Sequence, residues 1–107
     1  MNNTTRYAVI LVTASSRAEA EAIATALIQA QLAACVSFTP IHSMYTWNEE
    51  ICSDEEWQLI IKTDLNQFEA ISAKILSLHS YEVPEIIALP IETGSTAYLN
   101  WIGTMVK

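Results

Sequence analysis

The stretch over residues 32–63 constrains the fold of this chain most strongly. It consists of two apolar runs with an acidic segment, residues 48–56, between them. β-Branched and aromatic residues recur in both runs, as is typical of strands. We therefore predict a long antiparallel hairpin that turns near Asn48 and Glu49. Such a hairpin would project beyond a chain of 107 residues and expose an edge that invites partner strands, so we expect an oligomer whose function lies between subunits.

The rest of the chain alternates strands and helices. The apolar run over residues 7–13 predicts a central, buried strand. Ser16 and Glu19 form a capping box, which predicts a helix over residues 17–31. After the hairpin we expect a helix over 65–78, a loop over 79–84, a strand over 85–91 and a short helix that begins after Ser95 or Thr96. The order βαββαβ, followed by a C-terminal helix, predicts an α+β, ferredoxin-like sandwich that forms one domain over residues 1–107.

Two features of this fold have consequences for its surface. The first and last strands are apolar on both faces, whereas two helices cover only one face of a ferredoxin-like sheet. We expect the C-terminal helix and a neighbouring subunit to cover the other face.

Pro40 interrupts the first hairpin strand, where we expect a bulge, a bend or an unpaired position. The three tryptophans are candidate interface anchors, with ordinary core positions as the alternative: Trp47, Trp57 and Trp101.

Composition narrows the classes of partner. The net charge of −7 argues against nucleic acid and anionic membranes, which both need basic patches. The apolar runs are too short to span a bilayer, and the first residues do not read as a signal peptide, so we expect a cytoplasmic protein without membrane insertion.

Cys35 and Cys52 would lie about 30 Å apart along the hairpin, too far for a disulfide. Two free thiols fit a reducing compartment.

Five stretches, in order and at matching spacing, point to one family. They are Ala33-Ala34-Cys35-Val36, Ser43-x-Tyr45-x-Trp47, Glu56 with Lys62-Thr63, His79-x-Tyr81-x-x-Pro84-Glu85-Ile86-Ile87-x-x-Pro90-Ile91, and Tyr98-Leu99-x-Trp101-Ile102. Together they resemble the CutA family, proteins linked to divalent-cation tolerance. The resemblance implies a homotrimer joined through its hairpins and binding of copper and other divalent cations, without established enzymatic chemistry. It also implies a trimer similar to the P-II signalling proteins, which suggests a sensor of a metal or small ligand.

His79 is the candidate metal ligand. It follows a predicted helix and precedes Tyr81 and Glu82, and a neutral imidazole suits copper, zinc and nickel. The alternative is a histidine that interacts with the C-terminal end of that helix. Where some family members carry a second histidine and a first-strand cysteine, this chain has Leu78 and Val12.

A ligand pocket between subunits is the second candidate site. Glu56 and Lys62 share one face of the return strand and would need partners if that face meets another subunit. The region looks like the family's candidate ligand pocket, and its alternative role is a salt-bridge network that stabilises the trimer. The residues predicted to line it are Tyr45, Trp47, Glu56, Lys62, Tyr81 and Glu85.

Two rival functions remain at the level of sequence. Acylphosphatases share the fold class and use an arginine in the loop after the first strand, where this chain has Arg17 but no glycine. We predict no enzyme, because no Ser/His/Asp or Cys/His set is visible. A scaffolding or P-II-like signalling trimer without specific metal binding is the alternative to a metal or small-ligand sensor or buffer. The sequence identifies no protein partner.

Overall fold

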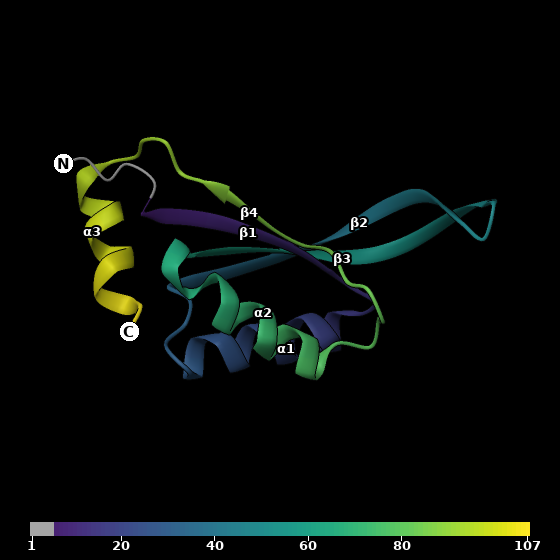
Figure 1. The fold of residues 1–107 in the computed structure, drawn as a ribbon, viewed down its shortest axis with the longest axis horizontal. Coiled ribbons are helices and arrows are strands. Elements are labelled where there is room, and N and C mark those ends of the chain that lie inside the picture. The colour runs from purple at the N-terminus through teal and green to yellow at the C-terminus, as the bar shows by residue number, and fades with distance from the viewer. Residues whose placement is uncertain (1–5) are drawn as a thin grey trace.

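The computed structural model describes residues 6–107, which form a four-stranded sheet and three α-helices (Figure 1). The elements are β1 (Tyr7–Ala14), α1 (Arg17–Gln29), β2 (Cys35–Trp47), β3 (Glu50–Asp64), a 3-10 turn (Leu65–Gln67), α2 (Phe68–Leu78), β4 (Ile86–Pro90) and α3 (Thr96–Met105). The strand order is β2-β3-β1-β4, and all neighbouring strands are antiparallel. This confirms the predicted α+β, ferredoxin-like arrangement with a C-terminal helix.

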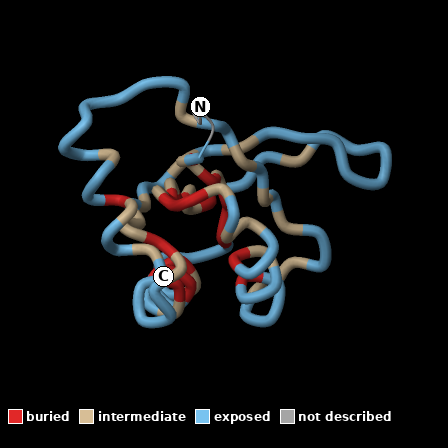
Figure 2. Tube along the Cα trace, turned by 60° about the vertical axis from the view of Figure 1, so that its left-hand side comes forward, coloured by how far each residue is buried: buried red, intermediate tan, exposed pale blue. Residues whose placement is uncertain are grey.

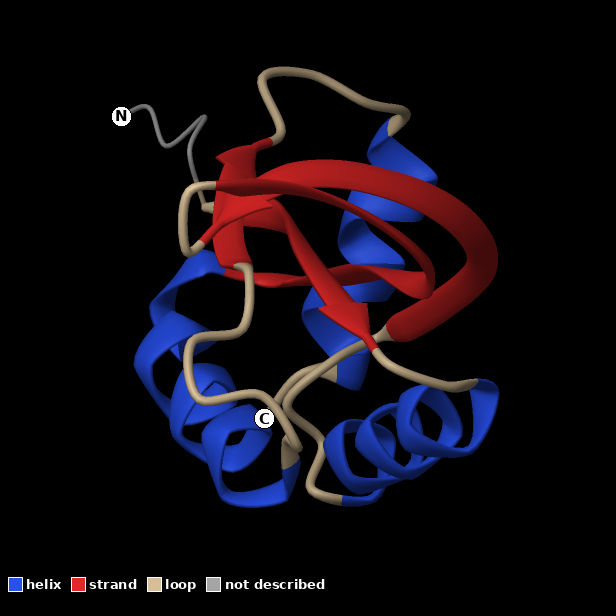
Figure 3. Cartoon of the chain, turned by 90° about the vertical axis from the view of Figure 1, so that its right-hand side faces the viewer, coloured by secondary structure: helices blue, strands red, loops and turns tan. Residues whose placement is uncertain are grey.

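The hydrophobic core lies between the sheet and the helices α1 and α2, which cover one face of the sheet (Figures 1 and 3). Alternate residues of β1 and β3 point into this layer, and the register pairs Ile10 with Ile61. Ile23 of α1 and Ile71 of α2 meet them from the helix side, and all four side chains are fully buried. The apolar stripes of the two helices therefore position the loops that leave them.

The hairpin is long and regular. β2 and β3 pair from Cys35 opposite Lys62 to Trp47 opposite Glu50. Asn48 and Glu49 both have positive φ values, 52° and 66°, as in the two-residue turns that match the twist of paired strands. The predicted turn position is confirmed. The far half of the hairpin extends away from the helices and is almost entirely exposed in one chain (Figure 2).

Three local predictions differ from the structure. The β2–β3 register continues past Pro40 without a bulge, because β2 is an edge strand and half of its N–H groups have no ladder partner. Helix α1 ends at Gln29, and Gln31 has a positive φ of 59° that turns the chain toward β2. The second helix begins with a 3-10 turn, since the Asp64 side chain accepts a hydrogen bond from Asn66 N at 2.9 Å and caps the turn.

The second face of the sheet carries apolar side chains that one chain leaves partly uncovered. The register places Val9 beside Leu89 and Leu11 beside Ile87 on this face. Ile87 and Leu89 are 48% and 49% exposed. Helix α3 buries Ile102 but lies at the end of the sheet remote from the hairpin turn (Figure 1). No helix within residues 6–107 is long and apolar enough to cross a membrane.

Candidate functional site

A pocket of about 660 Å³ opens where the hairpin passes the loop between α2 and β4. Of the six residues predicted to line a ligand pocket, the structure brings five to its wall: Tyr45, Trp47, Glu56, Tyr81 and Glu85. Lys62 does not line it. Lys62 shares a strand face with Glu56, but the two are six positions apart along β3, which corresponds to about 20 Å.

Glu56 is the most deeply buried carboxylate in the wall of this pocket. Only 7% of the residue is exposed, and the Tyr81 hydroxyl donates a hydrogen bond to its Oε2 at 2.7 Å. Within residues 6–107 it forms no salt bridge, and no side chain donates a hydrogen bond to Oε1. Every fully buried side-chain oxygen in these residues has a partner, so Oε1 is accessible from outside. The carboxylate is thus largely buried, has no cation beside it, and keeps one free oxygen.

The two phenols of the pocket both donate to carboxylates. The hydrogen bond from Tyr45 to Asp54 raises the pKa of Tyr45 to about 12. Burial, followed by the hydrogen bond to Glu56, raises the pKa of Tyr81. Both hydroxyls therefore keep their protons at neutral pH and remain hydrogen-bond donors.

Sequence reasoning missed other residues of the pocket wall. Glu82 adds a carboxylate at the exposed rim beside the predicted Glu85, and Met44 and Val83 add apolar surface. No lysine, arginine or histidine lines the pocket. Glu82 was identifiable from its place beside Tyr81 in a loop, whereas Met44 and Val83 carry no polar group that would mark them. All charged side chains of the wall are acidic, so the pocket favours a cation over an anion.

The side chain of His79 is fully buried, and both of its ring nitrogens have partners. Nε2 donates to the carbonyl oxygen of Thr13 at 2.6 Å, because a carbonyl only accepts. Nδ1 accepts a hydrogen bond from the Tyr81 N–H at 3.0 Å. No lone pair is left for a metal unless one of these bonds breaks, so this geometry does not support the predicted ligand role. Residues 6–107 hold no group of three or more His, Cys, Asp or Glu residues placed to share a metal ion.

Known proteins resemble the chain along nearly its whole length. The family model described as CutA1 divalent ion tolerance protein matches residues 8–105. This chain belongs to the CutA1 divalent ion tolerance family. The Divalent-cation tolerance protein CutA of Thermus thermophilus is 42% identical over 95 residues, which are 88% of this chain and 92% of that protein. The chain is also 42% identical over 95 residues to the chloroplastic CutA of Arabidopsis thaliana, about half of whose length it spans.

Solved structures of CutA proteins share the fold. A structure described as the periplasmic divalent cation tolerance protein CutA of Archaeoglobus fulgidus superposes with a TM-score of 0.93 at 39% identity. It covers 94% of this chain and 99% of its own. The CutA structure of Synechococcus elongatus has a TM-score of 0.93 at 36% identity, with 99% and 95% covered. The resemblance to the CutA family is confirmed.

The donor atoms of this CutA1-family chain suit some divalent cations better than others. The carboxylates of Glu56, Glu82 and Glu85 are the oxygen donors that hard cations such as Mg²⁺ and Mn²⁺ prefer. Copper prefers imidazole and thiolate ligands. Both ring nitrogens of His79 already have hydrogen-bond partners. Cys35 and Cys52 lie ten residue pairs apart along the hairpin, because Cys52 is opposite Tyr45. The described residues of one chain therefore do not fit the predicted copper site.

The carboxylate of Glu19 holds the pocket loop in place. Oε1 accepts hydrogen bonds from Ser15 N and Oγ at 2.8 and 3.0 Å, and Oε2 accepts one from Ser80 N at 2.7 Å. Burial alone would raise the pKa of Glu19, but these hydrogen bonds outweigh it and lower the pKa to about 2. Glu19 thereby fixes the loop that carries His79 and Tyr81, and through Tyr81 it positions Glu56.

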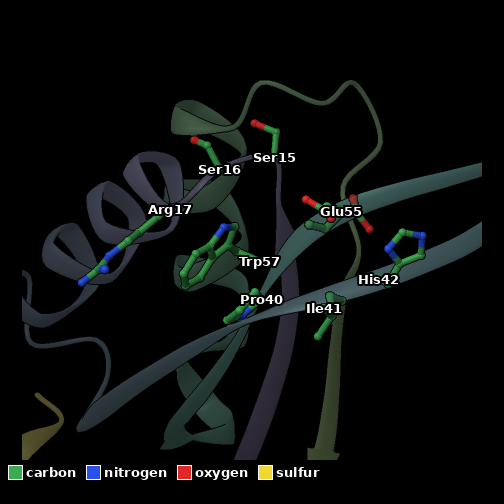
Figure 4. Close-up of a pocket in the computed structure, with 9 residues that line it drawn as sticks. Ser15, Ser16, Arg17, Pro40, Ile41, His42, Glu55 and Trp57 are labelled. Carbon is green, nitrogen blue, oxygen red and sulfur yellow. The ribbon is translucent and has the colours of Figure 1, made fainter.

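A second hollow of about 670 Å³ lies between the start of α1 and the hairpin (Figure 4). Arg17 points away from His42 in this view, and its Nε lies 3.5 Å from Glu21 Oε1 while its guanidinium lies over the Trp57 ring. The Ser15 N–H at the start of α1 already donates to Glu19. The anion loop that an acylphosphatase would need is therefore not formed here.

Proposed function

We propose that this chain acts in divalent-cation tolerance by taking up a cation in the pocket at Glu56. The observation that carries the proposal is a carboxylate with 7% exposure and no cationic partner within residues 6–107. An unpaired buried charge is costly, and a bound cation offsets that cost. The family's description supports a divalent cation, and the rim carboxylates Glu82 and Glu85 add attraction.

We further propose that the protein assembles as a homotrimer through its hairpins. The uncovered apolar face around Ile87 and Leu89 supports assembly, as does Trp47, which is 59% exposed on the hairpin. Three copies would place the pocket, which lies on the hairpin, near a neighbouring subunit. Light scattering during serial dilution tests this proposal. A trimer is the expected result, and a monomer that retains its secondary structure would contradict it.

The cellular role we propose is sensing or buffering of the bound cation. Copper is the narrower candidate that the family resemblance implies, although the oxygen donors at Glu56 suit harder cations better. A P-II-like signalling or scaffolding trimer without specific metal binding is the alternative, and the fit of the carboxylates to a cation favours the binding role over it. The predicted cytoplasmic location stays a prediction, since relatives are described as periplasmic and as chloroplastic.

Calorimetric titration of Mn(II), Zn(II) and Cu(II) tests the binding site. The samples are wild type, Glu56→Gln, His79→Ala and the control Glu69→Gln, which removes one exposed carboxylate outside the pocket. We expect saturable binding that Glu56→Gln abolishes and the other two variants retain. Equal binding in all four proteins would remove Glu56 from the site, and a loss confined to His79→Ala would return the metal to the histidine.

A further inference from the structure

We infer that the pocket at Glu56 also accepts an aliphatic diamine, an organic cation with two positive charges. The inference rests on the proposed cation pocket and names the class of its ligand. The volume of about 660 Å³ lies in the range of small-molecule sites. Residues 6–107 offer no group of three acidic, histidine or cysteine side chains that converges on one point, so a metal ion at Glu56 would keep part of its water shell and the pocket has room for a larger cation.

The pocket carries carboxylates both at a buried position and at its exposed rim, so each ammonium group of a diamine has an acceptor. Glu56 is buried and keeps Oε1 free of side-chain donors among the described residues, so it offers one deep acceptor. Glu82 and Glu85 are exposed at the rim and offer the second. No basic side chain lines the wall to compete with a ligand. An ammonium group brings its own three donors to a carboxylate, so it needs no set of converging ligands.

The remaining wall suits the alkyl chain that joins two ammonium groups. Trp47 and Tyr45 present aromatic rings from β2, and rings of this kind attract cations by about 0.5–2 kcal/mol. Met44 and Val83 are 70% and 80% exposed in one chain. A hydrated metal ion gains nothing from contact with such side chains, whereas methylene groups gain by removing them from water.

Calorimetry with 1,4-diaminobutane at 0.15 M salt tests the inference. Wild type is expected to bind one diamine per protomer, more tightly than butylamine, which carries a single charge. Glu56→Gln is expected to weaken binding at least 10-fold. Trp47→Leu removes the ring but keeps an apolar side chain for the proposed subunit contact. Once light scattering shows that it assembles as wild type does, it is expected to weaken binding roughly 3- to 10-fold. The control Glu69→Gln, which makes the same change in net charge, should bind as wild type does.

The possible results separate the ligand class from the pocket itself. Circular dichroism establishes that each variant is folded before titration. Absence of saturable diamine binding overturns the inference, and so does an equal loss in Glu69→Gln, which would indicate unspecific charge attraction. If the protein binds Mn(II) in a Glu56-dependent manner but does not bind the diamine, the proposed cation pocket stands and only the assignment of a diamine ligand fails. If neither ligand binds, both fail together.

Discussion

Replacement of Glu19 by glutamine tests how the pocket loop is held. The wild-type carboxylate accepts three hydrogen bonds, from Ser15 N, Ser15 Oγ and Ser80 N. An amide keeps one oxygen acceptor but turns an NH₂ group toward N–H donors on the other side. The difference between the ordinary pKa of 4.5 and about 2 in the fold corresponds to about 3 kcal/mol. Because 12% of the side chain is exposed, we expect a loss of roughly 2–3 kcal/mol at pH 7.

The pH dependence follows from the direction of the Glu19 pKa. Its folded-state pKa lies below its unfolded-state value, so its contribution is complete above about pH 4.5 and is lost as the pH falls toward about 2. Urea unfolding of wild type and Glu19→Gln at fixed protein concentration should show a deficit at pH 7 that shrinks toward pH 2. The control Glu21→Gln breaks only an exposed ion pair with Arg17 and should cost less than about 0.5 kcal/mol. A Glu19→Gln protein as stable as this control at pH 7 would refute the reasoning.

Three further substitutions have expected effects. Tyr81→Phe removes the sole side-chain donor that the described residues give the Glu56 carboxylate. It should cost about 1–3 kcal/mol in urea unfolding, and a neutral result would mean that water replaces the hydroxyl. Glu49→Gly relieves a positive φ of 66° and should stabilise the protein by about 1 kcal/mol, seen as a higher Tm; a lower Tm would contradict the turn geometry. Ile71→Ala empties a fully buried position and should cost about 2–5 kcal/mol, and a loss below 1 kcal/mol would argue against the packing of α2.

The fold was predictable because its signals are local. The alternation of apolar residues along the hairpin, the acidic turn and the helical stripe that includes Ile71 each appear within a few residues of one another. Pro40 was misjudged because its cost depends on whether its strand is at the edge of the sheet, and strand order is not a local property. The capping pattern of Ser16 and Glu19 located the helix, and Ser16 Oγ does accept from Glu19 N at 3.1 Å.

The candidate site was predictable only in part. The sequence identified residue types, and the structure brought Tyr45, Glu56 and Tyr81 to one pocket. The sequence could not show that both ring nitrogens of His79 already have hydrogen-bond partners. Those partners are backbone groups, the Thr13 carbonyl and the Tyr81 N–H, and almost every residue type provides such groups. The acceptor of the Ser80 N–H is Glu19, 61 residues earlier in the chain, and no spacing rule reaches that far.

The most direct test of the account is a crystal structure after a Mn(II) soak, read from the anomalous difference map. We expect a peak within about 2.1–2.4 Å of the Glu56 carboxylate, with Tyr81 still donating to the other oxygen. A peak at the ring of His79, or peaks on surface carboxylates with none at Glu56, would contradict the claim that the buried, unpaired Glu56 is the cation site.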